Sequence, residues 1–384
     1  MKTLQLVPAL EQGGVERGVV EVNRALVAHG WENVVVSAGG RLAATIEADG
    51  GRHVTLDVKS KNPLTYFSRA YRLRRLLRAE RPDVVCAHSR VPAWLFAFAN
   101  RTLGMKWISF AHGANSISPY SRIMTAGDLI VTPSRFIADY LKDAYGVSDS
   151  KMRVIPRAVE ADKFDTAKLD GEFIASKRAE WRTDGRWIVM AVGRITQLKG
   201  YDVLIRAIAR MVGSRVPRDR ERSDVNAEDA RPLPKLVIVG EAENLRKNVE
   251  DDLRRLVAEL GVEDDVVFAG NQQKVAECLS IADVVVSANT RKPEAFGRSM
   301  AEALVMGKPV VATAFGGALD IVDDGVNGAL VDPCVADLGL GFADALARVR
   351  SMKFADLRKR ALERFSFDIM ISRTISAYEE LSPP

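Results

Sequence analysis

Short runs of β-branched residues alternate with amphipathic stretches from one end of the chain to the other. This alternation is typical of repeated βαβ units, in which parallel strands lie between two layers of helices. We therefore expect an α/β protein with two doubly wound, Rossmann-like domains. The predicted strands lie near residues 3–7, 33–37, 53–56, 83–87, 107–111 and 128–132, and then near 188–192, 235–239, 266–269, 283–287 and 309–312.

The domain boundaries follow from where this rhythm stops. Residues 156–171 have no sustained period and carry alternating charges, so we interpret them as the linker. We predict an N-terminal domain over residues 1–165, a C-terminal domain over 166–365 and a final helix within 366–384. That helix has an apolar stripe at Ile371, Ile375 and Tyr378, and we expect it to cross back and pack on the N-terminal domain.

One segment, residues 213–234, breaks the pattern. It contains the run Arg-Asp-Arg-Glu-Arg and three prolines, and it stands where a short helix-to-strand turn is normal. Because it is too polar to bury, we expect a mobile surface loop.

The composition places the chain among globular proteins. Hydrophobic residues make up 47% and charged residues 27% of 384, and no apolar run approaches the ~18 residues that span a bilayer. The first ten residues have the pattern of a strand rather than an export leader, so we expect a cytoplasmic protein. The net charge of +5 does not indicate a nucleic-acid partner, and the three cysteines lack metal or redox spacing.

Two carboxylates, Glu294 and Glu302, are the most informative pair in the sequence. We predict that Glu294 lies at the mouth of a helix and Glu302 inside it, with both carboxylates near one face. Free backbone N–H groups beside Gly297 can bind an anion. A nucleotide sugar, which has phosphates in its middle and hydroxyls at both ends, fits this arrangement. The alternative is a dipole-complementing glutamate followed by a surface charge.

A second candidate element is the loop Gly193-Arg-Ile-Thr-Gln-Leu-Lys199-Gly, which follows a predicted strand. It places Arg194 and Lys199 at the carboxyl end of that strand, where ligands bind in open α/β sheets. Two cations there can neutralise a diphosphate as a sugar leaves it. The alternative is a capping loop with two solvated cations.

The N-terminal half offers a glycine pair and a histidine. Gly13 and Gly14 follow the first strand, where they let the backbone approach a phosphate at a helix N-terminus, although such a pair can also be only a tight turn. It is not a G-x-G-x-x-G fingerprint, so a nicotinamide cofactor is disfavoured. His112 ends another predicted strand, and it either hydrogen-bonds a sugar hydroxyl or is structural.

In their order and spacing, these elements resemble the retaining glycosyltransferases of family 4, which have the GT-B fold of two Rossmann-like domains facing across a cleft. The resemblance covers essentially the whole chain. Three stretches also resemble a bacterial subgroup associated with lipopolysaccharide core assembly: Ser60–Pro63, Ser89–Trp94 and Pro293–Arg298.

The resemblance implies a role for each residue. Arg194 and Lys199 would hold the donor diphosphate, and Glu302 would hold the ribose. Glu294, with the amides around Phe296 and Gly297, would hold the transferred sugar and the distal phosphate. Gly13 and Gly14 would approach the phosphate from the other domain, and His112 would line the sugar pocket. The implied reaction is front-face attack by the acceptor, without a metal or a cofactor.

Two positions depart from the family pattern, and they leave the base and the sugar of the donor open. The segment after the second strand of the C-terminal half has Gly240-Glu241 where relatives usually have Gly-Asp, and Asp320 stands where glutamate is more usual. Two other functions remain open: a nucleotide-sugar epimerase of the same fold and a non-catalytic nucleotide-sugar-binding protein.

Six arginines and one acid, Glu80, lie between Arg69 and Arg81 on a predicted helix whose apolar stripe includes Leu73 and Leu77. We expect the arginines to occupy the remaining circumference as a cationic face. This face either contacts a glycolipid acceptor or anionic headgroups at the inner side of the cytoplasmic membrane, or is merely solvated.

Overall fold

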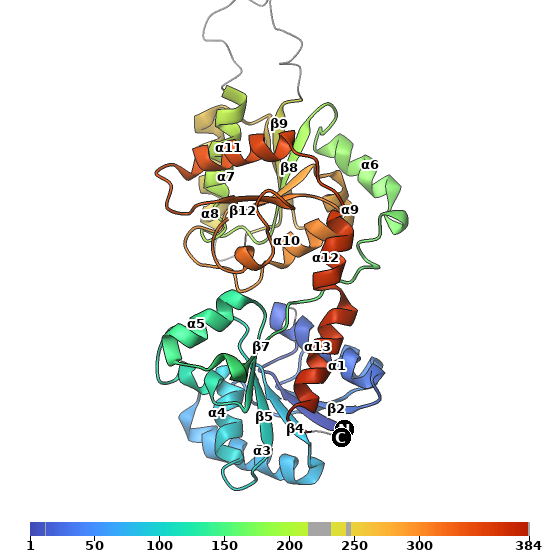
Figure 1. Ribbon diagram of the computed structural model, residues 1–384, viewed down its shortest axis with the longest axis vertical. Helices are drawn as coiled ribbons and strands as arrows, with labels where there is room; N and C mark the ends of the chain where they lie inside the picture. The colour runs from blue at the N-terminus through green and yellow to red at the C-terminus, as the bar shows by residue number, and fades with distance from the viewer. Residues whose placement is uncertain (12, 214–231, 243–246, 383–384) are drawn as a thin grey trace, which may run out of the picture. The chain divides into compact units, whose positions relative to one another are not determined.

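The computed structural model describes every residue except 12, 214–231, 243–246 and 383–384. The described chain forms two compact units, and we describe each by itself. Unit 1 comprises Met1–Ala158 and Phe367–Pro384, and unit 2 comprises Val159–Ser366. Both are Rossmann-like α/β domains (Figure 1).

The sequence-based boundary after residue 165 falls inside unit 2, because the chain joins unit 2 at Val159. The Val159 N–H donates to the Phe365 carbonyl at 2.8 Å, and Val159 also forms an isolated bridge with Ser366. Only three residues of the predicted linker, 156–158, therefore belong to unit 1.

Unit 1 is built on a seven-stranded parallel sheet in the order β3-β2-β1-β4-β5-β6-β7. Helices α3 and α4 cover one face, whereas α1 and α13 pack on the other. The strands are Lys2–Leu6, Glu32–Ser37, Arg52–Thr55, Val84–Ala87, Lys106–Phe110, Leu129–Thr132 and Met152–Val154. The helices are α1 Gly14–Ala28, α2 Ala43–Ala48, α3 Tyr66–Glu80, α4 Arg90–Ala99, α5 Arg135–Tyr145 and α13 Phe367–Glu379.

Unit 2 has a six-stranded parallel sheet in the order β10-β9-β8-β11-β12-β13. One core lies under α7, α8 and α11, and a second lies under α6, α9, α10 and α12. The strands are Trp187–Val192, Pro234–Val239, Val266–Gly270, Val284–Ser287, Val310–Thr313 and Gly328–Val331, for β8 to β13. The helices are α6 Gly171–Glu180, α7 Tyr201–Gly213, α8 Lys247–Leu260, α9 Val275–Ile281, α10 Arg298–Val305, α11 Leu338–Ser351 and α12 Leu357–Phe365.

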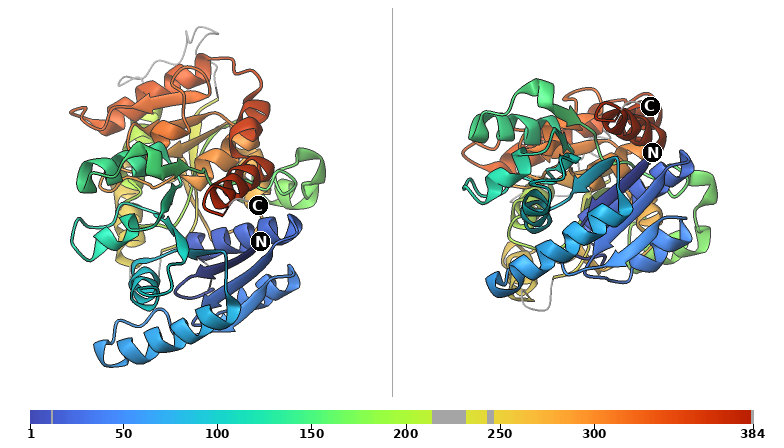
Figure 2. Two further views of the ribbon diagram at one scale, coloured as in Figure 1. Left: turned by 60° about the horizontal axis from the view of Figure 1, so that its bottom comes forward. Right: turned by 90° about the horizontal axis from the view of Figure 1, so that it is seen from below.

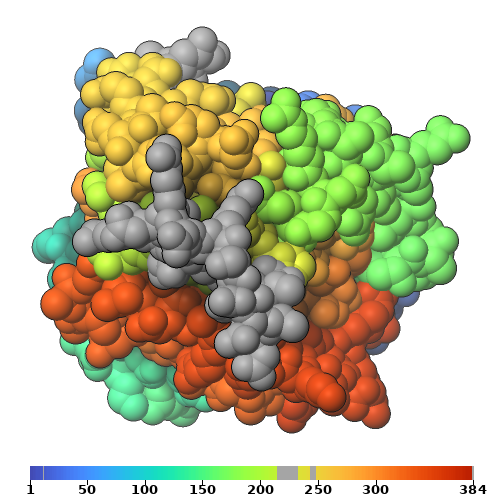
Figure 3. Space-filling model, turned by 90° about the horizontal axis from the view of Figure 1, so that it is seen from above, coloured from blue at the N-terminus to red at the C-terminus, as the bar shows by residue number. Residues whose placement is uncertain are grey.

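Figure 3 shows one face of unit 2, to which α6 (green), α8 (yellow) and α11 (orange-red) contribute. The predicted loop over residues 213–234 lies largely outside the described residues. Within the described part of the chain, none of the helices has the length and apolar character needed to cross a bilayer.

The eleven predicted strands are all present, but the last strand of each sheet was not predicted. Strand β7, Met152–Val154, has only three residues and an arginine at its centre. Strand β13, Gly328–Val331, begins with glycine and alanine. Both are edge strands, where short length and weak β-propensity are tolerated.

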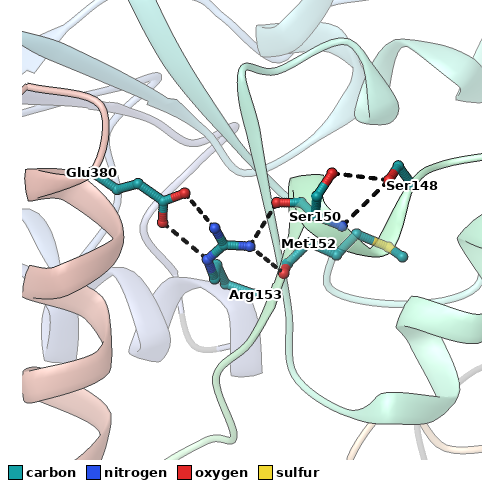
Figure 4. A network of polar contacts seen from close by, with 5 residues as sticks. All are labelled: Ser148, Ser150, Met152, Arg153 and Glu380. Atoms are coloured by element: carbon teal, nitrogen blue, oxygen red, sulfur yellow. Dashed lines mark hydrogen bonds and ion pairs between the residues drawn. The ribbon is translucent and has the colours of Figure 1, made fainter.

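Helix α13 packs on the sheet of unit 1. Tyr378 is completely buried, and its hydroxyl oxygen accepts a hydrogen bond from the Cys86 thiol at 2.8 Å. Beyond the helix, Glu380 forms a two-pronged ion pair with Arg153, whose guanidinium also donates to the carbonyls of Ser150 and Met152 (Figure 4). The C-terminal segment thus contacts unit 1 through the apolar stripe of α13 and through Glu380.

Candidate functional site

In unit 2 the strand order reverses between β8 and β11, and the carboxyl ends of these strands define the candidate site. Ligands of open α/β sheets bind outside the strand ends at such a switch point. The loop after β8 carries Arg194 and Lys199, and the segment after β11 leads to Glu294. The topology therefore brings together two elements that stand about a hundred residues apart in the sequence.

Lys199 and Glu294 form an ion pair through Lys199 Nζ and Glu294 Oε1. Their side chains are 26% and 19% exposed. The second carboxylate oxygen, Glu294 Oε2, is buried and has no hydrogen-bond partner among the described residues. A buried carboxylate oxygen without a donor is unusual, and it indicates a position for a donor group of a ligand or for water.

Helix α10 begins directly beside this pair, at Arg298. Its N-cap is Gly297 with φ of +95°, and a Cβ there would collide with Met300 Cε and stand 3.0 Å from Glu294 Oε2. Only glycine fits this position without strain. The first turn of α10 therefore leaves backbone N–H groups available to an anion.

The helix starts later than the sequence suggested. Glu294 lies in the loop before α10, where its backbone bridges to Gly316, whereas Glu302 lies inside the helix and is half-buried. The prediction of one helix face for both carboxylates was therefore wrong. Phe296 is buried in the core, with its ring edge-to-face against Phe365 at 5.7 Å, so only its backbone remains for a ligand.

Three residues near this edge were not predicted from the sequence. Tyr201 is buried, its hydroxyl donates to the Gly193 carbonyl at 2.8 Å, and burial together with Glu294 raises its pKa. This bond holds the start of the loop that carries Lys199. Asn289 Oδ1 and Thr313 Oγ1 follow or end β11 and β12, and both atoms are buried without a hydrogen-bond partner among the described residues.

In unit 1 the strand order reverses between β1 and β4, and a chain of polar side chains lies at this second switch point. His88 follows β4, and its Nε2 lies 3.0 Å from Gln5 Oε1 in β1. Its Nδ1 lies 3.0 Å from His112 Nε2, and His112 Nδ1 in turn contacts the Arg157 guanidinium. Because the guanidinium and Gln5 Oε1 fix the two ends, each imidazole donates toward Gln5 and accepts from the Arg157 side.

Both histidines are held in the neutral form. Burial, helped by the charge of Arg157, lowers the pKa of His88 to about 3. The same causes, together with His88, lower the pKa of His112 well below its usual range. His88 was not predicted, although it ends a strand just as His112 does. Since both ring nitrogens of His112 have partners, a hydrogen bond to a sugar would have to replace one of them.

Gly13 and Gly14 lie at the start of α1, as predicted. Gly13 is the extended N-cap, and Gly14 is the first helical residue. Outside the neighbouring backbone of α1, no atom of the described residues lies within 4 Å of a Cβ built on Gly14, so its backbone is open on that side. In the part of the chain that the structure describes, no three His, Cys, Asp or Glu side chains are grouped so that they could hold a metal ion.

Two family models match this chain. The model "Glycosyltransferase Family 4" matches residues 12–163, which lie almost entirely in unit 1, and "Glycosyl transferases group 1" matches residues 173–361 of unit 2. Together the two models cover both Rossmann-like units. The chain belongs to this family of glycosyltransferases.

Individual relatives agree with this assignment. The chain is 28% identical to the lipopolysaccharide core biosynthesis glycosyltransferase LpsE of Rhizobium meliloti, over 92% of this chain and 90% of LpsE. Two curated D-inositol 3-phosphate glycosyltransferases are 33% identical, but the chain matches only 56% of their length.

Solved structures show the same fold. A glycosyltransferase from Rickettsia africae is 26% identical, with a TM-score of 0.85 over 100% of this chain and 98% of that one. Anabaena HepE in complex with UDP-glucose has a TM-score of 0.74 at 20% identity, over 98% of this chain and 100% of HepE.

Proposed function

We propose that this glycosyltransferase takes a nucleotide diphosphate sugar as its donor and transfers the sugar, with retention of anomeric configuration, to a saccharide or glycolipid acceptor. The observation that carries the proposal is Glu294. One of its carboxylate oxygens contacts Lys199, and the other is buried beside the mouth of α10 with no hydrogen-bond partner in the described part of the chain. The solved complex of HepE with UDP-glucose supports the choice of donor. The similarity to LpsE supports a place in lipopolysaccharide or other envelope glycan assembly.

In this proposal, different residues of unit 2 bind different parts of the donor. Arg194 and Lys199 neutralise the diphosphate, and the backbone N–H groups at Phe296 and Gly297 bind its distal phosphate. Glu294 Oε2 accepts a hydrogen bond from a hydroxyl of the transferred sugar, which gives this buried atom its partner. Glu302 accepts two hydrogen bonds from the ribose hydroxyls.

Unit 1 supplies the remaining proposed contacts. Gly13 and Gly14 approach the phosphate with their backbone, and His112 lines the sugar pocket. These roles come from the resemblance, and the neutral state of His112 is compatible with contact to an uncharged sugar.

The proposed reaction needs no metal or cofactor, because the cations of the loop after β8 offset the charge that develops on the leaving group. The bond between the anomeric carbon and the diphosphate oxygen breaks, and its electron pair stays on that oxygen. An acceptor hydroxyl attacks from the same face, and its proton passes to the departing phosphate. The new glycosidic bond therefore keeps the original anomeric configuration.

We propose that the enzyme works in the cytoplasm at the inner face of the cytoplasmic membrane, with the arginines of α3 toward anionic lipid. The structure changes the set of arginines that can do so. Arg69 is buried, and Arg74 donates to the Ala99 carbonyl at 2.9 Å, so the prediction that all six face outward was wrong. The exposed ones are Arg72, Arg75, Arg78 and Arg81.

A thermal-shift screen of the full chain against UDP-, GDP- and ADP-sugars tests the donor. A ligand at ~100 times its dissociation constant adds about 2.7 kcal/mol to the free energy of unfolding. Turnover is then followed by release of the nucleoside diphosphate with a mixture of saccharide acceptors, and NMR of the product gives its anomeric configuration. An epimerised sugar formed from donor alone would show an epimerase, and a thermal shift without any turnover would show a binding protein.

A further inference from the structure

An apolar groove lies on unit 1, apart from the polar chain of His88 and His112. It encloses about 580 Å³, within the range of roughly 300–1,000 Å³ that is usual for small-molecule sites. Four aromatic side chains line it, from the start of α3, from α4 and from the loop before residues 121–125: Tyr66, Phe67, Trp94 and Tyr120. Three polar residues before α3, Ser60, Lys61 and Asn62, also line it.

Two of the polar groups on these walls already have partners. The Tyr66 hydroxyl donates to the Trp94 carbonyl, and the Trp94 indole N–H donates to the Tyr120 carbonyl, both at 3.0 Å. At one end of the groove, the buried Arg69 guanidinium donates to Thr65 Oγ1 and to the Asn62 carbonyl. Hydrogen bonds therefore hold the aromatic walls in place, and these walls present mainly ring faces to the groove.

The edge of the groove continues into an exposed apolar stripe. Leu64, Phe67 and Tyr71 are 90%, 66% and 63% exposed, and their spacing places them along one side of α3 and the turn before it. Figure 2 shows α3, in light blue, along the outer layer of unit 1. Large apolar side chains that gather on one exposed surface mark an interaction site.

The charge around this stripe is of one sign. Arg72, Arg75 and Arg78 are exposed on α3, and none of them forms an ion pair with any residue that the structure describes. Glu80, the acid of this helix, is held by Lys2 and Arg52. An uncompensated cationic surface beside exposed aromatic rings is typical of helices that lie in the interface of an anionic bilayer.

We infer that α3 docks on the surface of an anionic lipid bilayer, with Leu64, Phe67 and Tyr71 inserted below the headgroups and one acyl chain held in the aromatic groove. A peptide or a saccharide needs several hydrogen-bonding groups from its site, whereas the aromatic side chains of the groove offer mainly ring faces. A hydrocarbon chain needs only the ring faces. The exposed arginines contact the lipid phosphates.

This inference deepens the proposed function, and it rests on that function only for the identity of the acceptor. The chain that follows His112 runs to Tyr120, which forms one wall of the groove. The groove therefore lies at the same carboxyl edge of the sheet as His112. A glycolipid whose acyl chain occupies the groove would present its headgroup at this edge.

Vesicle co-sedimentation of the full chain without donor tests the surface. We expect binding to phosphatidylglycerol vesicles that exceeds binding to phosphatidylcholine vesicles, and that weakens as salt is raised. The variant Arg72→Gln/Arg75→Gln/Arg78→Gln should bind on the order of a hundredfold more weakly. A control with the same loss of charge in unit 2, Arg206→Gln/Lys359→Gln/Arg360→Gln, should bind as the parent does.

The apolar stripe has its own pair of variants. Leu64→Ser/Phe67→Ser/Tyr71→Ser should reduce vesicle binding about tenfold or more, without lowering the melting temperature, because these side chains are exposed. The control removes exposed apolar groups of unit 2, in Leu319→Ser/Val326→Ser/Leu340→Ser, and should leave binding unchanged. Vesicle binding that falls equally in the α3 variant and in the unit 2 control, or no vesicle binding by the parent protein, would contradict docking on a membrane. The exposed apolar stripe would then be interpreted as a surface for a protein partner.

Quenching of tryptophan fluorescence locates the acyl chain. Lipids brominated in the chain should quench the parent protein, and Trp94→Phe should lose most of this quenching. Of the other four tryptophans, Trp107 and Trp181 are buried, Trp31 packs against Tyr378 of α13, and Trp187 lies in unit 2 under Arg350. Unchanged quenching in Trp94→Phe would overturn the groove as the site of the chain. These measurements use no sugar, so they can succeed even if the chain proves not to be a transferase, and turnover with a water-soluble acceptor can survive if they fail.

Discussion

The two switch points of this protein have the same strand topology, but the side chains at them differ in charge. In each unit the first and fourth strands of the sheet are neighbours, and polar residues follow their carboxyl ends. In unit 1 these residues are neutral imidazoles, linked by hydrogen bonds from Gln5 to Arg157. In unit 2 they are Lys199 and Glu294, a partly exposed ion pair in which one carboxylate oxygen has no hydrogen-bond partner among the described residues.

From this contrast we infer that the fold determines where a site forms, whereas the side chains determine which ligand the site binds. The four ring nitrogens of His88 and His112 all have partners, whereas Gln5 Nε2 is buried without one among the described residues. The imidazoles therefore have no ring nitrogen left for a substrate unless an existing hydrogen bond is exchanged. An ion pair with an unmet hydrogen-bonding capacity is instead ready for a polar ligand. We therefore expect substitutions in unit 2 to reduce turnover most, and substitutions in unit 1 to act mainly on stability and its pH dependence.

The largest effect is expected from Lys199→Met. It removes a cation at the position where charge develops on the leaving diphosphate, and one preorganised donor of this kind is worth roughly 10² to 10³ in kcat. Glu294→Gln should also reduce turnover, because it weakens the pairing that holds Lys199. Steady-state turnover with the donor found by thermal shift measures both.

The matched control is Lys292→Met, which removes an exposed cation two residues before Glu294. It should keep the parent's turnover. If Lys199→Met folded and retained full activity, the proposed role of Lys199 at the leaving diphosphate would be contradicted.

The next effect is expected at Gly297→Ala. Its φ of +95° and the collision of a new Cβ with Met300 Cε force the mouth of α10 to move. A non-glycine residue in a strained backbone conformation costs of order 1–3 kcal/mol, and the same movement disturbs Glu294 Oε2. We expect a lower melting temperature together with a higher KM for the donor. An unchanged KM with a lowered melting temperature would assign Gly297 to structure alone.

Most of the fold could be predicted from the sequence, because buried parallel strands are continuous β-branched runs such as Val284–Ser287. The two edge strands, β7 and β13, were not predicted, because an edge strand need not be apolar on both faces. The domain boundary at Val159 was not predicted for another reason. It depends on a hydrogen bond to Phe365, a residue far away in the sequence.

The candidate site was predictable where loops follow strands. Lys199 was placed by this rule and Glu294 by its expected position at the mouth of a helix, and the structure pairs them. Tyr201 and Asn289 were not predicted, because the sequence around a buried hydroxyl or amide does not show what that group contacts. Arg69 shows the same limit, since an arginine on an amphipathic helix looks exposed until its three backbone and hydroxyl partners are known.

A smaller effect is expected from the histidines of unit 1, and its sign follows from their low pKa. Below pH ~6.5 the unfolded chain takes up a proton at His88, whereas the folded chain does so only near pH 3. The unfolded state is thus favoured as the pH falls, by about 2 kcal/mol at pH 5 for this residue. The stability is present above the ordinary pKa and is lost below it.

His88→Gln should therefore flatten the decline of the unfolding midpoint between pH 6.5 and pH 4, measured by urea titration at each pH. His29→Gln is the control, because His29 is 45% exposed in the same unit, and it should leave the slope as in the parent. If both variants kept the parent's slope, His88 would not be held neutral in the folded protein, and the proposed difference in charge between the two switch points would be contradicted.

The smallest effect is expected from Gly14→Ala, which tests whether unit 1 contributes to donor binding. Outside the neighbouring backbone of α1, a Cβ on Gly14 meets no described atom within 4 Å, and Gly14 starts α1 without a positive φ. Alanine loses less conformational entropy than glycine, so the free energy of unfolding should rise by about 0.4–1 kcal/mol. If Gly14 approaches the donor phosphate as proposed, the same methyl group will raise the KM for the donor in a more stable protein. A stabilised variant with the parent's KM would leave donor binding to unit 2 alone.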